Sequence, residues 1–415
     1  MEQLVLNDVL FAYQAGTLNN DSLYQSIATR KGISQTALNQ TVEIGSSGKY
    51  TSAIKRRVRW FQQTLKSQNL LERVGKGEWC LTRNGKQQLT KLAAQKFLIA
   101  ANTDLGVMVW GDCRSVFAST IDKDIQLCFT SPPYLGIKRN YGHSTVNEER
   151  QYCQFIIDVL KPIAARMKPG ASLAINLPND VYVPQNHGRR STYLERLTLM
   201  IEDEVGLMLM DRIIWHPGNK MPAPTFATKP PHTHLKQQYE FVLWFCNDPA
   251  QCHQFANNQT LLTPYSAQHK SLVLQGGERS ERVNADGNYT IKKGAFSKVN
   301  AGALPTNVVE IGTTCNAYGR AIAKAAKSMG FAPHGAAFPL NLAKYFVAWL
   351  ATPGKGLCVD PFGGRLTTAK ACEDLGIDYL ISELHYEYIK PALTQFTQLK
   401  GFLVNPAFNH FLDHQ

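Results

Sequence analysis

A stiff polar turn in the middle of the sequence has the residue types needed to hold an amino group. Thr130, Ser131, Pro132, Pro133 and Tyr134 come directly after the apolar segment DIQLCF. Two successive prolines fix φ and remove two N–H donors, so the turn is rigid and presents carbonyl acceptors. The Ser131 hydroxyl and the Pro132 carbonyl can accept both hydrogens of one exocyclic amino group, and Tyr134 offers a flat face for a base. Taken alone, the motif is better explained as a purely structural strand-to-loop turn.

A glycine-rich turn about 230 residues later has the features of a nucleotide-binding loop. The strand-like segment LCVD ends at Asp360, and Gly363 and Gly364 follow before the helix-like segment LTTAKACEDLG. Glycines let the backbone approach a ligand closely, and the next helix N-terminus offers free N–H groups. The following strand-like segment ends at Glu383, where an acid can accept both hydroxyls of a ribose. Because the spacing is not GxGxxG, a tight turn with a surface acid is the alternative.

Alternating strand-like and helix-like segments predict the fold that positions both turns. The alternation starts near Asn102 and is typical of an α/β fold, with a mostly parallel sheet and helices on both of its faces. Ligands of such sheets bind beyond the carboxyl ends of the strands, so we expect the two turns to meet at one rim. Residues 249–305 interrupt the alternation with 6 Lys+Arg, 3 Asp+Glu and many Asn, Gln and Ser. We interpret them as an insertion.

The first 100 residues have a different pattern and a strong positive charge. They carry 14 Lys+Arg and 6 Asp+Glu, which is +8 of the chain's net +12. The patterns predict helices at Leu4–Tyr13, from Asp21 to Gly32, through residues 54–65 and at residues 84–100, with a hairpin turning at residues 75–77. This order resembles the winged helix-turn-helix domains attached to restriction-type enzymes. The resemblance implies DNA contacts from the basic residues Lys55, Arg56, Arg57, Arg59 and Lys76. A helical packing domain with a solvated basic face is the alternative.

Four further segments complete a recognisable pattern together with the two turns. They are Trp110-Gly111-Asp112, Met167–Gly170, Arg212–Trp215 and His334–Leu342. In this order the chain resembles the amino-group DNA methyltransferases that use S-adenosylmethionine, in the permuted subgroup whose catalytic motif precedes the cofactor motif. Thr130–Tyr134 is similar to the family's Asp/Ser-Pro-Pro-Tyr, and Asp360–Thr368 is similar to its cofactor turn. The similarity covers about residues 105–395 apart from the insertion.

The resemblance implies a Rossmann-like methyltransferase sheet of seven mostly parallel strands with helices on both faces. It also implies a division of the chain into four parts. They are a winged-helix DNA-binding domain at 1–100, a catalytic domain at 101–400, an inserted target-recognition region at 249–305 and a C-terminal tail at 401–415.

The resemblance also implies roles for individual residues. The catalytic turn comprises Ser131, Pro132, Pro133 and Tyr134. Tyr134 and Trp215 line the target-base pocket, although a core position is equally compatible with Trp215. S-adenosylmethionine is the implied cofactor, with Asp112 at its adenine amino group and Glu383 at its ribose. The remaining implied cofactor-binding residues are His334, Phe338, Pro339, Asp360, Phe362, Gly364 and Thr367.

The identity of the target base depends on Ser131. In this family Ser at the first motif position is found more with cytosine N4 and Asp more with adenine N6, so we expect cytosine N4 in double-stranded DNA. The base must be flipped out of the duplex to reach such a turn. Adenine N6, RNA or protein amino groups are alternatives. Arg365 and Leu366 stand where Ser and Gly are usual, so a catalytically weak DNA-binding regulator is another alternative. A restriction-modification role implies a cognate endonuclease as partner.

Composition excludes several other classes of protein. Among the 415 residues 44% are hydrophobic and 18% charged, which excludes a disordered or fibrous chain. No apolar run reaches the roughly 18 residues that cross a bilayer, and no basic region precedes the first apolar stretch as in a signal peptide. Nine cysteines without a CxxC pair argue against a structural zinc site. We therefore expect a cytoplasmic protein without a bound metal or a membrane partner. The resemblance adds the expectation of a nucleoid-associated protein of bacterial or phage origin.

Overall fold

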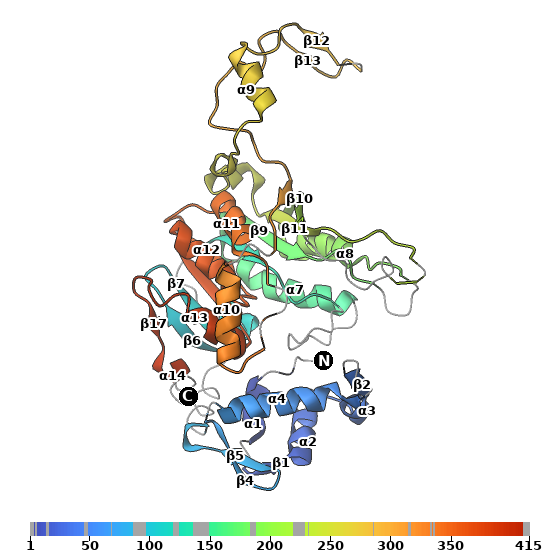
Figure 1. Ribbon diagram of the computed structural model, residues 1–415, viewed down its shortest axis with the longest axis vertical. Coiled ribbons are helices and arrows are strands. Elements are labelled where there is room, and N and C mark those ends of the chain that lie inside the picture. The colour runs from blue at the N-terminus through green and yellow to red at the C-terminus, as the bar shows by residue number, and fades with distance from the viewer. Residues whose placement is uncertain are drawn as a thin grey trace.

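The structure is a computed structural model in which a small N-terminal domain lies against a larger α/β domain (Figure 1). It describes residues 4–409 except for 5, 14–15, 45–48, 68, 86–96, 119–123, 136–148, 183–187, 219–228, 231, 285, 314–316, 333 and 335–336. None of the helices among these residues has the length and the apolar character that crossing a membrane requires.

The N-terminal domain combines helices with two small antiparallel sheets. Its elements are α1 (Leu6–Ala12), β1 (Leu18–Asn19), α2 (Asn20–Lys31), α3 (Gln35–Asn39), β2 (Thr41–Ile44), β3 (Lys49–Ser52), α4 (Ala53–Ser67), β4 (Leu71–Gly75) and β5 (Glu78–Leu81). One sheet has the order β1-β5-β4, and β2 pairs with β3. The predicted basic helix and the hairpin around residues 75–77 are confirmed by α4 and by the antiparallel β4–β5 pair.

The ends of α2 follow from local capping chemistry. The Asn19 side chain accepts a hydrogen bond from the Ser22 N–H, so the helix begins one residue before the expected Asp21. Gly32 has φ 61° and ends the helix as predicted, because its left-handed conformation suits a residue without Cβ. The predicted helix at 84–100 is wrong at its end, since Phe97–Asn102 forms strand β6, and residues 86–96 lie outside the described residues.

The α/β domain is built on one large mixed sheet. Its strands are β6 (Phe97–Asn102), β7 (Gly106–Gly111), β8 (Ile125–Thr130), β9 (Met167–Leu177), β10 (Met208–His216), β11 (Glu240–Cys246), β14 (Val308–Glu310), β15 (Leu357–Asp360), β16 (Tyr379–Glu383) and β17 (Leu403–Val404). The order across the sheet is β14-β10-β11-β9-β8-β15-β16-β7-β6-β17. Within the described residues the sheet therefore has ten strands, and the expected seven is corrected.

The additional strands lie at the edges of the sheet. The five neighbours β9, β8, β15, β16 and β7 run parallel, whereas β11 is antiparallel to both of its neighbours. Strand β6 pairs antiparallel with β7, and β17 pairs with β6. The sheet therefore crosses both predicted domain boundaries, at residues 100/101 and 400/401. Edge pairing has no periodic signal of its own in the sequence, and this explains the difference.

Helices cover both faces of the sheet, as predicted. They are α6 (Cys113–Ala118), α7 (Glu149–Ala164) and α8 (Tyr193–Met200) in one hydrophobic cluster, and α10 (Ala317–Ser328), α11 (Leu340–Leu350), α12 (Thr367–Leu375) and α13 (Tyr386–Leu393) in the other. A π-helical turn, Ile201–Val205, extends α8, and the short α14 (Pro406–Asn409) packs near β6. The second cluster also contains the core of the N-terminal domain, so apolar packing is continuous between the domains.

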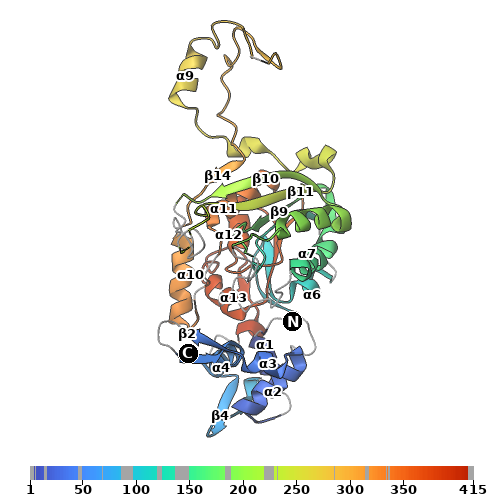
Figure 2. The same ribbon diagram turned by 90° about the vertical axis from the view of Figure 1, so that its right-hand side faces the viewer.

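The segment interpreted as an insertion projects from the α/β domain. Two 3₁₀ turns, Pro249–Gln254 and Asn258–Leu261, lie against β9 and α11. Beyond them, α9 (Ala267–Leu274) and the small hairpin of β12 (Arg282–Val283) and β13 (Thr290–Ile291) extend away from the domain. Figures 1 and 2 show this arm at the end of the molecule opposite the N-terminal domain.

A buried ion pair joins the two domains. The Arg57 Nη2 on α4 lies 3.6 Å from the Glu387 Oε1 on α13, and the Glu387 side chain is 1% exposed. The His385 Nδ1 is 3.6 Å from the same oxygen. Burial alone would raise the pKa of Glu387, but His385 and the Arg57 charge lower it. The Arg57 guanidinium also lies over the rings of Trp60 and Phe61. Arg57 thus packs within the domain contact, which differs from the DNA contact expected for it.

Replacing Arg57 with Ala is expected to lower the free energy of unfolding by about 3 kcal/mol, because the buried Glu387 carboxylate loses its partner. Arg56→Ala, at an exposed position of the same helix, should change it by less than about 0.5 kcal/mol. Urea denaturation of the two variants beside the wild type measures the difference. Equal effects would contradict a stabilising role for the ion pair.

Candidate active site

One buried carboxylate joins the two turns that the sequence singles out. Strands β8 and β15 are parallel neighbours, so their carboxyl ends reach the same rim. The Asp360 Oδ1 accepts hydrogen bonds from the Thr130 hydroxyl at 2.6 Å and the Phe362 N–H at 3.0 Å. Its Oδ2 accepts from the Thr368 hydroxyl at 2.6 Å. The prediction that the two turns meet at one rim is therefore confirmed.

The position of Asp360 is costly for a charged group. Its side chain is fully buried, and burial raises its pKa to about 6, while the hydrogen bonds from Thr130, Thr368 and Phe362 act in the opposite direction. At neutral pH the carboxylate is ionised and acts only as an acceptor, so both threonine hydroxyls must donate to it. The start of the catalytic turn and the start of α12 are fixed relative to each other in this way.

The glycine turn keeps a left-handed conformation although its sequence departs from the family pattern. Gly364 has φ 51° and Leu366 has φ 58°. Such a φ costs a leucine on the order of 1 kcal/mol. The Leu366 side chain is fully buried, which offsets this by roughly 2 kcal/mol. The Tyr318 hydroxyl on α10 lies 2.8 Å from the Arg365 carbonyl oxygen and 3.1 Å from that of Leu366. Tyr318 thus supports the turn at Leu366, where the resemblance leads us to expect glycine.

The acid at the end of β16 is oriented by the backbone. One Glu383 carboxylate oxygen accepts the Gly364 N–H at 2.7 Å, and the other accepts the His385 N–H at 2.7 Å. Glu383 is 7% exposed, and burial raises its pKa. Each carboxylate oxygen can accept a further hydrogen bond, so the group can still bind two adjacent hydroxyls.

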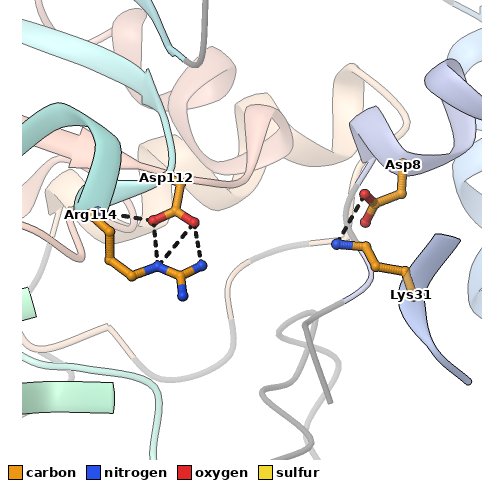
Figure 3. A network of polar contacts seen from close by, with 4 residues as sticks. All are labelled: Asp8, Lys31, Asp112 and Arg114. Carbon is orange, nitrogen blue, oxygen red and sulfur yellow. Dashed lines mark hydrogen bonds and ion pairs between the residues drawn. The ribbon is translucent and has the colours of Figure 1, made fainter. Parts of the chain in front are cut away.

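Asp112 follows β7 and is held by an arginine that the sequence analysis did not assign. The Arg114 Nη2 is 2.6 Å from the Asp112 Oδ2, and the Arg114 Nε is 3.1 Å from the Oδ1 (Figure 3). Burial alone would raise the pKa of Asp112, but Arg114 lowers it, and Lys31 of the N-terminal domain adds to this effect. Figure 3 shows the Lys31–Asp8 ion pair on the side of the N-terminal domain that faces Asp112.

The segment before α11 lies close to the glycine turn. The His334 Nε2 is 3.4 Å from the place that a Cβ on Gly364 would occupy. Burial, followed by the charges of Arg365 and His385, lowers the pKa of His334 to about 3, so its imidazole is neutral. Phe338 packs edge-on against Phe129 of β8, with ring centroids 5.1 Å apart, and Pro339 is the residue before α11.

The residues around the glycine turn fit the cofactor that the resemblance implies. The Thr367 hydroxyl opens α12, is buried, and has no hydrogen-bond partner within the part of the chain that the structure describes. Phe362 is half-buried and packs near Phe155, with 5.8 Å between ring centroids. Thr367 thus offers an unused hydroxyl, Glu383 an oriented acid and Gly364 a backbone without a side chain of its own, and these features suit a nucleotide-like ligand.

The catalytic turn contacts two polar residues that the sequence analysis missed. The Tyr134 hydroxyl donates to the Glu240 Oε2 at 2.7 Å. The Asn176 Nδ2 lies 3.0 Å from the Tyr134 oxygen, 3.1 Å from the Glu240 Oε2 and 3.4 Å from the Ser131 Oγ. Asn176 is the penultimate residue of β9 and Glu240 begins β11, so both lie at the rim of the sheet on the two strands that follow β8 across it. Polar residues at strand ends are the signal that could have identified them.

Trp215 does not join this cluster. It is 4% exposed, belongs to the hydrophobic core, and donates its Nε1–H to the Ile311 carbonyl at 2.8 Å. The core position that the sequence left open is therefore the observed one, and a role for Trp215 as a wall of the base pocket stays a prediction.

The other predicted DNA-contact residues lie on the surface of the N-terminal domain. Arg56, Arg59 and Lys76 are exposed. Lys55 is half-buried and donates from Nζ to the Asn39 Oδ1 at 2.7 Å. Among the described residues no group of three or more His, Cys, Asp and Glu side chains has the arrangement of a metal site.

Fold and site together define a class of protein. The parallel centre of the sheet carries a glycine turn after β15, an acid at the end of β16 and a Ser-Pro-Pro-Tyr turn after β8, an arrangement typical of methyltransferases. Residues 125–395 match the family model for DNA methylase, which is well over half of the chain, and the protein therefore belongs to the N6/N4 DNA methylase family. Residues 3–91 match the model for the Mrr N-terminal domain.

Two known proteins illustrate the similarity. The type II methyltransferase M.PvuII of Proteus hauseri is 28% identical over 298 residues, which are 72% of this chain and 85% of that protein. The solved structure of the PvuII DNA methyltransferase, described as cytosine-N4-specific, has a TM-score of 0.54 at 23% identity. It covers 76% of this chain and 95% of that chain, and it supports the fold.

The raised pKa of Asp360 makes stability depend on pH. The folded state favours the protonated carboxyl, so this contribution is fully present below about pH 3.8 and is lost as the pH rises through about 6. Compared with Asp360→Asn, which does not titrate, the wild type should lose about 3 kcal/mol of unfolding free energy between those limits. Denaturation curves across this pH range measure it.

Asp374 supplies a control of opposite sign. Burial would raise its pKa, but Lys344 and Lys370 lower it, so the wild type should gain stability relative to Asp374→Asn as the pH rises.

If the difference in unfolding free energy between the wild type and Asp360→Asn did not change with pH, the raised pKa of Asp360 would be refuted.

Proposed function

We propose that this DNA methylase transfers a methyl group from S-adenosylmethionine to the exocyclic N4 of cytosine in double-stranded DNA. The observation that carries the proposal is the link from the catalytic turn through Thr130 and Asp360 to the glycine turn. It holds a Ser-Pro-Pro-Tyr turn beside residues suited to a nucleotide cofactor. The cytosine-N4 assignment is supported by Ser131 and by the description of the PvuII enzyme.

The chain's own residues would act by positioning. When bound, S-adenosylmethionine supplies an electrophilic methyl group on its sulfonium. Ser131 Oγ and the Pro132 carbonyl would accept the two amine hydrogens and orient the nitrogen lone pair, which is otherwise delocalised into the ring. Pro133 keeps the turn rigid. Tyr134, whose hydroxyl is anchored to Glu240, would present its ring to the flipped base.

The cofactor would be held from several elements. Glu383 would bind the ribose hydroxyls and Asp112 the adenine amino group. Phe362 would pack near the adenine. Asp360 and Gly364 would shape the pocket for the methionine end, Thr367 would contact it, and the His334–Pro339 segment, including Phe338, would cover the amino-acid tail.

DNA recognition would be divided between two parts of the chain. The projecting arm within residues 249–305 would supply base contacts, since it is polar, basic and extended from the domain (Figure 2). The N-terminal domain, acting as a winged helix, would add phosphate contacts. The enzyme would work in the bacterial cytoplasm beside a cognate restriction endonuclease, in line with the type II designation of its relative.

Incubation of the protein with S-adenosylmethionine carrying a labelled methyl group and with unmodified genomic DNA tests the function. Nucleoside analysis should yield N4-methylcytosine. Ser131→Ala should lower kcat by about 100-fold, because one acceptor for the amine is lost, and should leave the Kd of S-adenosylmethionine nearly unchanged. Methylation-aware sequencing would give the target sequence.

Ser328→Ala, at the exposed end of α10, is the matched control and should retain wild-type turnover. Label in N6-methyladenine would replace the cytosine assignment. Label in RNA or protein with none in DNA would refute the proposal, and so would a protein that transfers no methyl group.

Charge reversal at Arg56 and Arg59 should weaken DNA binding and reduce the slope of log K against log salt by about 2, roughly 1 per phosphate contact. Reversal at Lys324 and Lys327, two exposed lysines of α10, changes the net charge equally and should leave the slope unchanged. Fluorescence anisotropy at several salt concentrations provides the measurement. Indistinguishable slopes for the two double variants would remove the N-terminal domain from DNA binding.

A further inference from the structure

Four polar side chains form a connected chain at the catalytic turn. Ser131 and Tyr134 lie in the turn after β8, Asn176 lies on β9, and Glu240 begins β11. Their polar atoms are separated by 2.7 Å, between the Tyr134 hydroxyl and the Glu240 Oε2, to 3.4 Å, between the Asn176 Nδ2 and the Ser131 Oγ. The Asn176 Nδ2 also lies 3.0 Å from the Tyr134 oxygen and 3.1 Å from the Glu240 Oε2. The Glu240 carboxylate thus accepts from Tyr134 and from the amide that reaches the serine.

We propose that Glu240 is a positioning residue that fixes the direction of these hydrogen bonds, so that Ser131 presents lone pairs to the target amine. The inference rests on the proposed function, because it concerns how the amine is received. It assigns a role to a residue outside the Ser-Pro-Pro-Tyr turn itself.

The direction follows from the inventory of donors. A carboxylate can only accept, whereas the Tyr134 hydroxyl has a single hydrogen. At 2.7 Å from Glu240, Tyr134 must give that hydrogen to the carboxylate. Burial, and after it Glu240, raise the pKa of Tyr134 well above its usual range, so the hydroxyl keeps its proton at neutral pH. The Tyr134 oxygen is then left as an acceptor.

The serine hydroxyl is oriented by the same constraint. Because Tyr134 gives its hydrogen to Glu240 and the Asn176 amide nitrogen faces the Ser131 Oγ, the Tyr134 oxygen is the acceptor that these side chains leave for the single Ser131 hydrogen. The Ser131 lone pair that Asn176 does not use is then available to the amine. A serine with the opposite orientation would direct its hydrogen toward an amine that is itself a donor. The carboxylate therefore determines whether Ser131 attracts or repels the substrate nitrogen.

Asn176 is oriented by Glu240 as well. Its amide nitrogen lies 3.1 Å from the Glu240 Oε2, and the reverse orientation would bring two acceptor oxygens together. The observed orientation leaves the buried Asn176 Oδ1 without a hydrogen-bond partner among the described residues. A buried acceptor without a partner is unfavourable, so the attraction between the amide and the carboxylate outweighs that cost.

The same direction provides a route for the proton that the reaction releases. Methyl transfer forms an N–C bond and breaks a C–S bond, and the product nitrogen then carries one surplus proton. Ser131 Oγ takes this proton as its own passes to Tyr134, and the Tyr134 proton passes to Glu240. Glu240 is half-buried and can return the proton to water, which restores the starting arrangement.

Steady-state kinetics of Glu240→Gln, Glu240→Asp and Tyr134→Phe with genomic DNA test the inference. Glu240→Gln keeps the shape but can donate to Tyr134, which reverses the chain, so kcat should fall by about 100-fold while KM for S-adenosylmethionine changes by less than about twofold. Glu240→Asp keeps the carboxylate and should recover at least about tenfold of that loss. The double variant Glu240→Gln/Tyr134→Phe should be no slower than the slower single variant, because both act through one chain.

Glu195→Gln, an exposed carboxylate on α8, is the matched control and should match the wild type. Wild-type turnover in Glu240→Gln would overturn the inference and leave the proposed function standing. Multiplicative losses in the double variant, or a Glu240→Asp variant as slow as Glu240→Gln, would also overturn it. A wild-type protein that labels no DNA would overturn the proposed function and the inference together.

Discussion

The hydrogen bonds of Asp360 hold together the two parts of the chain on which the site depends. A buried carboxylate at neutral pH is unfavourable, yet it accepts from a threonine at the end of β8, from the backbone of the glycine turn and from a threonine at the start of α12. A neutral side chain of the same size could not accept from all three donors. Burial of the charged Asp360 lowers the free energy of unfolding, but its hydrogen bonds keep the two distant turns at a fixed separation. Such an unfavourable burial of a charged group is typical of functional sites.

Much of the architecture could be predicted because it follows from short-range patterns. The strand that precedes Ser131 and the strand that ends at Asp360 are continuous apolar runs, and the rule that ligands bind beyond parallel strands brings the turns together. The basic helix α4 and the β4–β5 hairpin follow from periodicity and from turn residues. The residues of the glycine turn were recognisable even where Leu366 replaces glycine, since Tyr318 and burial retain the left-handed backbone.

The features that could not be predicted depend on contacts between distant residues. Phe97–Asn102 has a helix-like neighbourhood in the sequence but is drawn into the sheet by β7 and β17. Arg57 and Arg56 are adjacent basic residues on one helix, and only the position of Glu387 distinguishes their surroundings. The carboxylate of Glu240 likewise begins a strand with no local signal, and its contact with Tyr134 requires three strands to be in register.

The contact between the domains makes the N-terminal domain part of the enzyme's architecture. Glu387 lies four residues beyond Glu383, and the apolar cluster around it is continuous with that of the small domain. Removal of the first 100 residues would therefore uncover apolar surface and leave a buried acid without its counterion. Such a truncated chain would be a damaged enzyme as well as a poorer DNA binder, and gene fusions or domain exchanges at this junction would have to preserve the guanidinium–carboxylate contact.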